Sequence, residues 1–148
     1  MRNECLHLLN VDDKPEDALL FQRAVERSGL PIKLFVASSG EEASRYLEFG
    51  SDSPLRKAPD FIVLDVRMPG MSGLQLLEKI RRHNKCKPSS VIMWTVSDKD
   101  QDRDTARELG ASGYFLKDQN YPEPTEFVKD LYGHWVRGEV PDYWPKGT

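Results

Sequence analysis

The sequence predicts an α/β fold in which five parallel strands form a doubly wound (βα)5 sheet of flavodoxin-like strand order 2-1-3-4-5. Short apolar runs alternate five times with stretches of helical spacing along the 148 residues, a rhythm typical of βα units joined by right-handed crossovers. Polar or charged side chains follow four of these runs. The carboxyl ends of strands in open α/β sheets are where such proteins bind ligands, so both observations indicate the same architecture.

The first βα unit combines the apolar run Leu6–Val11 with a helix that starts at Pro15 and stops at Gly29. Proline is favoured in the first turn of a helix and glycine just after its last turn. Apolar residues recur at helical spacing and predict the buried face, which consists of Ala18, Phe21, Ala24 and Val25.

The second unit begins with a strand over Ile32–Ala37. Ser39 and Glu42 fit a capping box for a second helix that ends near Gly50. Residues 51–59 form a polar loop that contains prolines. This loop separates the second unit from the third strand.

The third strand is predicted over Phe61–Leu64, because an uninterrupted apolar run is typical of a strand buried on both faces. Ser72 is expected to cap the helix that follows, from Leu74 to about His83. We expect its inward side chains to be Leu74, Leu77 and Ile80.

The fourth strand is predicted over Val91–Trp94. Ser97 and Asp98 are expected to cap a helix that ends at Gly110. That helix is almost entirely polar, so it should pack weakly. The fifth strand is predicted over Gly113–Leu116.

The fifth helix has two candidate starts, Pro122 and Pro124, and should reach about Val136. From the length, we expect one domain over residues 1–137 and a short tail over 138–148, with no output domain.

Composition excludes several classes of protein. A pI of about 5.6 gives no reason to expect nucleic acid binding. No apolar stretch approaches the roughly 20 residues that span a membrane, and the N-terminus lacks a signal-peptide pattern. Cys5 and Cys86 make neither a disulfide framework nor a metal motif, and we expect Cys86 to be an exposed thiol. These features favour the cytoplasm.

The residues at the strand ends predict a site. Asp12 and Asp13 follow the first strand, Asp65 the third, Thr95 the fourth and Lys117 the fifth. Carboxylates that are brought together repel and recruit a cation, and hard oxygen ligands suit Mg²⁺. Asp65 could then attack phosphorus to form an acyl phosphate, while Lys117 and Thr95 contact the phosphoryl oxygens.

These residues resemble the receiver domains of bacterial response regulators, over about Cys5 to Val136. The shared features, whose order and spacing are specific, are Asp12-Asp13, the stretch Asp65-Val66-Arg67-Met68-Pro69-Gly70-Met71-Ser72-Gly73, Thr95, and the stretch Gly110-Ala111-Ser112-Gly113-Tyr114-Phe115-Leu116-Lys117.

The resemblance implies a role for each matching residue. Asp65 would be the phosphoacceptor. Asp13, Asp65 and the backbone carbonyl of Arg67 would bind Mg²⁺ directly, and Asp12 would bind it through water. Lys117 would contact the phosphate, and Thr95 with Tyr114 would form the switch pair.

The same resemblance implies a stand-alone response regulator in a two-component phosphorelay. It would catalyse only its own phosphorylation and dephosphorylation, so it would not otherwise be an enzyme. The residues Asp13–Ala18 and the long loop before Asp65 resemble regulators that are paired with phytochrome-type or other sensor kinases. The expected partners are a sensor histidine kinase or phosphotransfer protein, a downstream protein, and a second copy bound through the fourth-helix to fifth-helix face.

Three positions depart from the family pattern. Asp118 follows Lys117 where proline is usual, so we expect a trans bond, an altered loop and competition for Lys117. Val96 is bulkier than the usual residue and should restrict access to the phosphate. Arg67, together with Ser97, should tune the lifetime of the phosphoryl group.

One alternative function remains open, which is an adaptor with the same fold that works without phosphorylation. A flavodoxin-like electron carrier is rejected, because the acidic pair Asp12-Asp13 would repel a flavin phosphate. An aspartyl-phosphate phosphatase is rejected because Arg67 stands where those enzymes carry a second aspartate.

Overall fold

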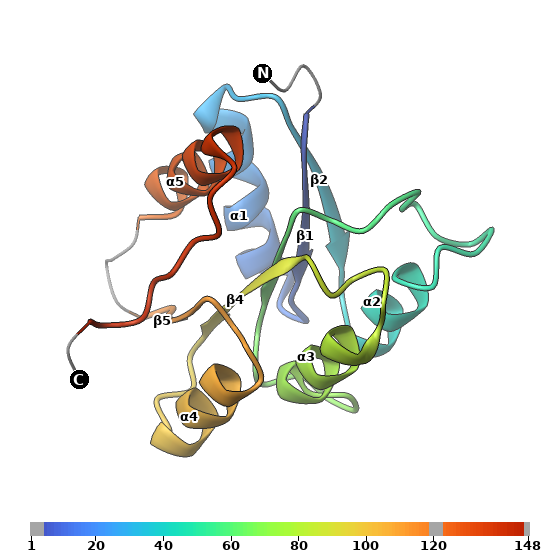
Figure 1. Ribbon diagram of the computed structural model, residues 1–148, viewed down its shortest axis with the longest axis vertical. Helices are drawn as coiled ribbons and strands as arrows, with labels where there is room; N and C mark the ends of the chain where they lie inside the picture. The colour runs from blue at the N-terminus through green and yellow to red at the C-terminus, as the bar shows by residue number, and fades with distance from the viewer. Residues whose placement is uncertain (1–4, 119–122, 147–148) are drawn as a thin grey trace.

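The computed structural model describes residues 5–118 and 123–146. Within these residues, five strands alternate with five helices (Figure 1), and their bounds are β1 Leu6–Val11, α1 Pro15–Ser28, β2 Ile32–Ala37, α2 Gly40–Tyr46, β3 Phe61–Leu64, α3 Gly73–Arg82, β4 Ser90–Thr95, α4 Asp100–Glu108, β5 Gly113–Leu116 and α5 Pro124–Arg137. The strands form one parallel sheet in the order β2-β1-β3-β4-β5. The predicted fold class and strand order are confirmed.

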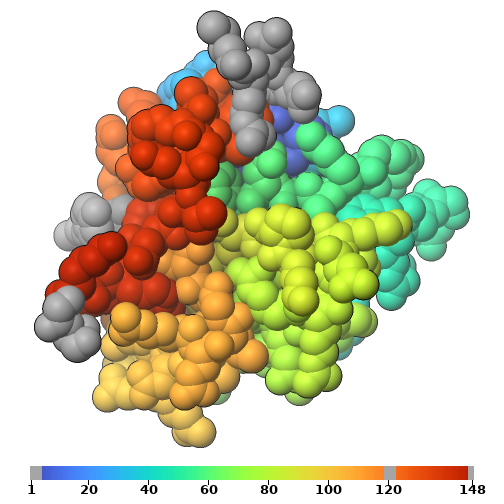
Figure 2. Space-filling model, viewed as in Figure 1, coloured from blue at the N-terminus to red at the C-terminus, as the bar shows by residue number. Residues whose placement is uncertain are grey.

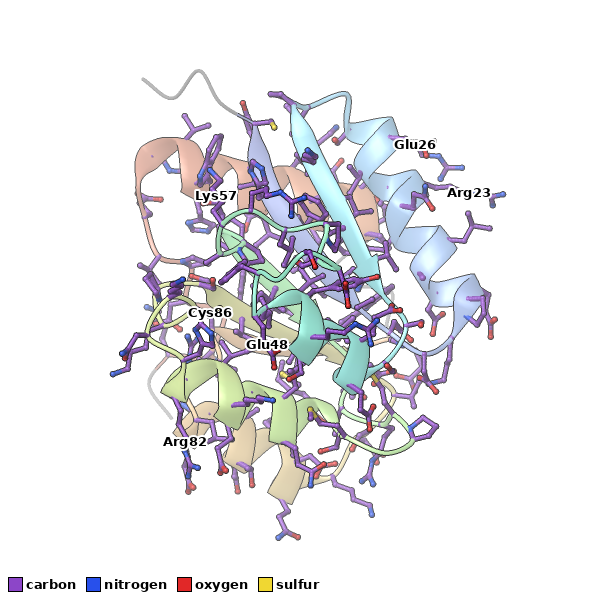
Figure 3. All side chains as sticks on the ribbon, turned by 90° about the vertical axis from the view of Figure 1, so that its right-hand side faces the viewer. Arg23, Glu26, Glu48, Lys57, Arg82 and Cys86 are labelled. Atoms are coloured by element: carbon purple, nitrogen blue, oxygen red, sulfur yellow. The ribbon has the colours of Figure 1, made fainter. Side chains whose placement is uncertain are left out.

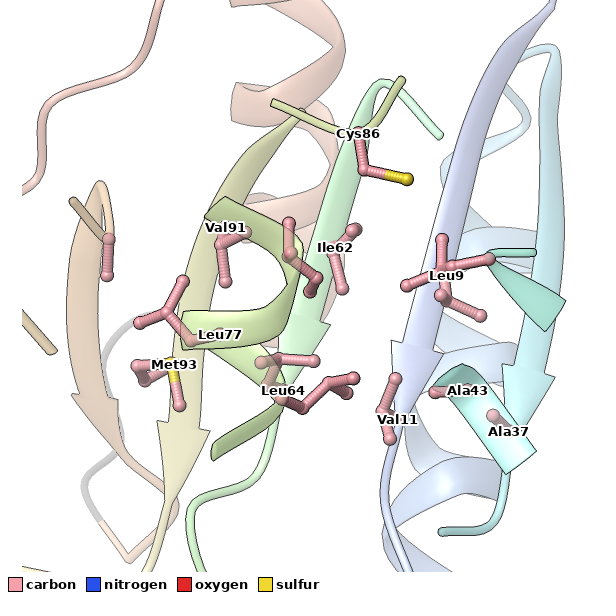
Figure 4. Close-up of a cluster of buried hydrophobic side chains, with 14 of the residues drawn as sticks. Leu9, Val11, Ala37, Ala43, Ile62, Leu64, Leu77, Cys86, Val91 and Met93 are labelled. Atoms are coloured by element: carbon pink, nitrogen blue, oxygen red, sulfur yellow. The ribbon is translucent and has the colours of Figure 1, made fainter. Parts of the chain in front are cut away.

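The sheet is covered on both faces, which explains why β3 is apolar throughout. Helices α1 and α5 pack against each other on one face, and α2, α3 and α4 cover the other (Figure 1). A hydrophobic core lies on each face. Figure 4 shows the core under α2, α3 and α4, where Leu9, Ile62 and Val91 of three neighbouring strands meet Leu77 of α3. Arg23 and Glu26 of α1 are exposed and point away from the sheet (Figure 3).

Cys86 was predicted to be exposed, and this is wrong. Its side chain is fully buried in the core under α3 (Figures 3 and 4). Burial raises the pKa of the thiol, and this outweighs the nearby charge of Lys85, which works to lower it. The charged neighbours Lys85 and Lys87 therefore do not predict whether the Cys86 side chain is exposed.

Two helix boundaries also differ from prediction. Helix α2 ends at Tyr46, well before Gly50, because turns follow and Phe49 adopts a left-handed φ of 59°. Ser39 caps this helix as expected, but the Glu42 carboxylate accepts from the Ser38 amide, so the capping box is only half formed. In α3 the predicted Ser72 cap is confirmed, as a full capping box with Gln75.

Helix α4 starts at Asp100 with Lys99 as its N-cap residue, so the predicted caps Ser97 and Asp98 are wrong. The Ser97 hydroxyl donates instead to Asp102. The predicted polarity of the helix is confirmed, and Ala106 is its buried residue. Of the two candidate starts for α5, Pro124 is correct, while Pro122 lies outside the described residues.

After α5 the chain turns at Gly138 and runs across β5 towards α4 (Figures 1 and 2). The Tyr143 amide donates to the Ser112 carbonyl at 2.7 Å, and the Trp144 indole donates to the Ala111 carbonyl at 2.6 Å. The segment 139–146, called the tail below, thus covers the outer edge of the sheet. None of the described helices is long and apolar enough to cross a lipid bilayer.

Candidate functional site at the carboxyl edge of the sheet

The predicted site residues lie together because of the register of the sheet. Val11 pairs with Leu64 and Thr95 pairs with Leu116, so neighbouring strands end at the same level. The residues that follow these strand ends therefore converge on one edge. They are Asp12, Asp13, Asp65 and Lys117.

Three carboxylates form the acidic centre of the site. One ligand oxygen each from Asp12, Asp13 and Asp65 lies within 4.8 Å of the others. Asp12 and Asp65 are buried, at 2% and 1% exposure. Oδ1 of Asp13 is also buried and accepts no hydrogen bond from the described residues. Hard oxygen donors with an unused lone pair fit Mg²⁺, which prefers carboxylates and retained waters. The backbone of Arg67 lies against this cluster, since its amide donates to Asp65 Oδ1 at 3.2 Å.

Lys117 joins these carboxylates. Its ammonium lies 2.6 Å from Asp12 Oδ2, 2.8 Å from Asp65 Oδ2 and 2.8 Å from Asp17 Oδ2. The side chain is only 6% exposed, so these ion pairs are screened weakly by solvent. Asp118 is exposed, and Lys117 reaches past it to the strand-end carboxylates. Asp118 was expected to compete for Lys117, but the contacts of the Lys117 ammonium are with Asp12, Asp17 and Asp65. We also expected an altered loop after Asp118. Its residues 119–122 lie outside the described residues.

Burial and ion pairing shift the pKa values in the site. Burial works to raise the pKa of Asp65, but hydrogen bonds from Lys117 and Thr95 outweigh it, so the pKa is lowered. At Asp12 burial prevails over the bond from Lys117, and the pKa is raised. Burial works to lower the pKa of Lys117, yet its carboxylate partners raise it well above its ordinary value. Asp65 is consequently an ionised carboxylate at neutral pH, as a nucleophile requires.

Two charged residues of the site were missed by the sequence analysis. Lys14 places its ammonium 3.3 Å from Asp65 Oδ2 and 3.5 Å from Asp13 Oδ1. Asp17 is the third partner of Lys117. The available signal for Asp17 was its place in the first turn of the helix that begins directly after the acidic pair.

The predicted switch residues lie behind the acidic centre. Thr95 is fully buried and its hydroxyl oxygen accepts from the Ser97 amide at 3.2 Å. Tyr114 is 9% exposed and its hydroxyl donates to the Ser97 carbonyl at 2.8 Å. Ser97 therefore contacts both members of the pair, and the tyrosine lies inward in this structure. Val96, by contrast, is 50% exposed.

Arg67 points towards α4. Its guanidinium lies 2.8 Å from Asp102 Oδ2, the same oxygen that accepts from the Ser97 hydroxyl at 2.5 Å. The loop after β3 is thus tied to the first turn of α4. Sequence reasoning placed Arg67 and Ser97 beside the site but did not identify Asp102 as their common partner.

Comparison with protein families matches most of the chain. The model of the response regulator receiver domain matches residues 8–129. Response regulator Rcp1 from Synechocystis sp. is 24% identical over 129 residues, which are 87% of this chain and 88% of the relative. PhoP from Bacillus subtilis, the alkaline phosphatase synthesis regulator, is 34% identical over 84% of this chain. The chain spans only 47% of PhoP and 32% of NarL from Escherichia coli, to which it is 42% identical over 74 residues.

Solved structures are similar over most of the chain. The phosphorylated cyanobacterial phytochrome response regulator RcpA is 25% identical with a TM-score of 0.79, covering 90% of this chain and 96% of its own. The Mn²⁺-bound form of Rcp1 is 25% identical with a TM-score of 0.75, covering 88% of this chain and 94% of its own.

Proposed function

Because the chain belongs to the response regulator receiver domain family, we propose that it is a stand-alone regulator that accepts a phosphoryl group on Asp65 in a two-component phosphorelay. The observation that carries this proposal is the position of Asp65. Its carboxylate is buried and ionised, has Lys117 at 2.8 Å, and shares a cluster with Asp12 and Asp13.

In the proposed reaction an Asp65 oxygen attacks the phosphorus of a phosphohistidine. The oxygen–phosphorus bond forms while the phosphorus–nitrogen bond breaks. The nitrogen keeps the electron pair, and the donor ring, which carries a proton on its other nitrogen, leaves as neutral imidazole. Asp13, Asp65 and the Arg67 carbonyl would hold Mg²⁺ directly and Asp12 through water, and the ion would neutralise charge on the phosphoryl oxygens. Lys117 stabilises the same oxygens. The chain would catalyse only its own phosphorylation and its reversal.

The switch would act through Thr95 and Tyr114. Phosphorylation adds charge and strong acceptors at Asp65, and Thr95 already helps to lower the pKa of this carboxylate. Tyr114 and Thr95 share Ser97 as a contact. A change at Asp65 would therefore bias the α4–β5–α5 surface between two arrangements, which a downstream protein or a second copy would read.

The partner that supplies the phosphoryl group would be a sensor histidine kinase or a phosphotransfer protein. The likeness to RcpA and Rcp1 makes a phytochrome-type kinase the first to test. A surface depression of about 380 Å³ lies beside Asp13. It is lined in part by Leu19 and Val36, which are 45% and 37% exposed. Exposed apolar side chains next to the site suit a protein that docks there.

The test is labelling with acetyl phosphate, with and without Mg²⁺, read by intact mass. Wild type should gain one phosphoryl group only when Mg²⁺ is present, and Asp65→Asn should gain none. Asp118→Asn, which removes an exposed carboxylate after Lys117, should be labelled like wild type. A folded wild-type protein that stays unlabelled at every Mg²⁺ concentration would instead favour the adaptor that works without phosphorylation.

A further inference from the structure

Lys14 occupies an unusual position for a lysine. It is the N-cap residue of α1, where Ser, Thr, Asp or Asn usually provides a side-chain cap, and its side chain makes no such bond. A cation at a helix N-terminus also opposes the helix dipole. The helix start therefore disfavours lysine at this position. The ion pairs of Lys14 with the acidic centre compensate for the missing cap.

The Lys14 ammonium lies between two of the expected metal ligands. It is 3.3 Å from Asp65 Oδ2 and 3.5 Å from Asp13 Oδ1. Its backbone amide donates to Asp12 Oδ1 at 3.0 Å, so the start of the side chain is anchored at the site. The Lys14 side chain is 35% exposed, so the ammonium can turn out towards solvent.

The spacing of the carboxylates suits a small bridging cation. Ligand oxygens that bind one Mg²⁺ directly lie at most about 4.2 Å apart, because each bond is about 2.1 Å long. One oxygen each of Asp12, Asp13 and Asp65 lies within 4.8 Å of the others. The Lys14 ammonium already bridges Asp13 and Asp65, the two expected direct ligands, at longer N–O distances of 3.5 and 3.3 Å.

The charges of the site leave room for one divalent ion. Four carboxylates face two ammonium groups, which leaves two negative charges in excess; these groups are Asp12, Asp13, Asp17, Asp65, Lys14 and Lys117. We propose that Lys14 is a tethered cation that occupies the metal site in the absence of Mg²⁺ and must be displaced when Mg²⁺ binds. This inference rests on the proposed Mg²⁺ site and adds a competitor that sets its affinity.

The experiment is a Mg²⁺ titration followed by backbone amide NMR shifts, which report the dissociation constant, the binding position and the fold together. Lys14→Met should bind Mg²⁺ about five-fold more tightly than wild type, the equivalent of one exposed ion pair of about 1 kcal/mol. Lys14→Arg keeps the cation and should stay near wild type. Lys33→Met removes an exposed lysine near the start of β2, far from the site, and should also stay near wild type.

The outcomes separate the two proposals. If all four proteins bind Mg²⁺ with the same affinity, or Lys14→Met binds it more weakly, the competition by Lys14 is overturned while the metal site stands. If the Asp13 and Arg67 amides of no variant shift with Mg²⁺, the metal site of the proposed function is overturned, and the inference with it.

Discussion

At the scale of single residues, Lys117 forms ion pairs with three carboxylates of the site. Its ammonium contacts Asp12, Asp17 and Asp65 while only 6% of its side chain is exposed. Removing one partner of a buried ion pair leaves a charge that neither water nor protein compensates. Two carboxylates would be left in that condition, because Asp12 and Asp65 are both buried.

We therefore expect Lys117→Met to lower the free energy of unfolding by about 3 kcal/mol at pH 7 in EDTA. The deficit should shrink at pH 5. In wild type the lowered pKa of Asp65 gives stability that is present at both pH values, because it is lost only as the pH falls below the ordinary value of 3.8. In the variant, burial without Lys117 raises that pKa, so protonation restores stability as the pH falls. Added Mg²⁺ should also reduce the deficit, because it should bind the folded variant, whose carboxylates lack the charge of Lys117, more tightly than it binds wild type.

Urea unfolding at both pH values, with and without Mg²⁺, measures these differences. Lys33→Met, which removes an exposed lysine of β2, is the matched control and should change the unfolding free energy little. A deficit in Lys117→Met that is the same at pH 5 and pH 7 would contradict the assignment to uncompensated carboxylates.

At the scale of elements, the contact between the tail and β5 depends on a glycine. A Cβ added at Gly113 would lie 2.6 Å from the Tyr143 Cβ. The Tyr143 ring packs against Phe115 and Phe127, with centroids 5.3 and 5.8 Å away, and its hydroxyl donates to Asp130. The glycine lets the tail lie flat on the edge strand, which otherwise exposes unpaired backbone groups.

Gly113→Ala should therefore destabilise the protein by about 2 kcal/mol through overpacking. In a Tyr143→Gly background, which lacks both the ring and the Cβ, the same change should be neutral or stabilising, because glycine weakens a strand interior. Thermal or urea unfolding of the four proteins gives the coupling energy. Gly133→Ala, in α5 beside the flexible Arg137 side chain, is the control and should not destabilise. Additive effects of the two changes would show that the tail does not pack on Gly113.

The elements also show what the sequence could and could not predict. Strands were predictable because they are mostly apolar runs, four of which are followed by polar or charged residues, and the acidic pair with Asp65 followed from that order. Contacts that depend on the direction of a side chain were not. Ser97 looked like a helix cap, but the partner it finds is Asp102. Cys86 lies between lysines in the chain, yet a turn carries its thiol into the core. Lys14 joins the site only once the first helical turn is built.

At the scale of the whole molecule, α4 buries fewer apolar side chains than α1, α3 or α5. Helix α1 buries three apolar residues and α5 buries four, and the two helices contact one another. Helix α4 buries Ala106 alone among its residues. Segments with few buried apolar contacts open at the lowest free energy. Helix α4 is held instead by polar contacts to the loop after β3, and it lies beside the proposed switch residues, so it is the element best suited to respond to Asp65.

We expect Asp102→Asn to increase amide hydrogen exchange in α4 by about five-fold, equivalent to the roughly 1 kcal/mol of a partly exposed ion pair. The reason is that Asp102 accepts from both Arg67 and Ser97, and the substitution removes its charge. Exchange in α1 and α5, on the other face, should stay unchanged. Mass spectrometry of deuterated peptides resolves the three helices in one experiment.

Asp104→Asn provides the matched control, because Asp104 is an exposed carboxylate of the same helix. It removes the same charge without the contact to the β3 loop, so a shared increase would assign the effect to the net charge of α4 and refute the role of the Arg67 contact.

Phosphorylation of Asp65 in wild type should alter exchange in α4 more than in α1 or α5. A response spread equally over all helices would mean that the signal does not travel through the Arg67–Asp102 contact, since that contact joins the loop after Asp65 to α4.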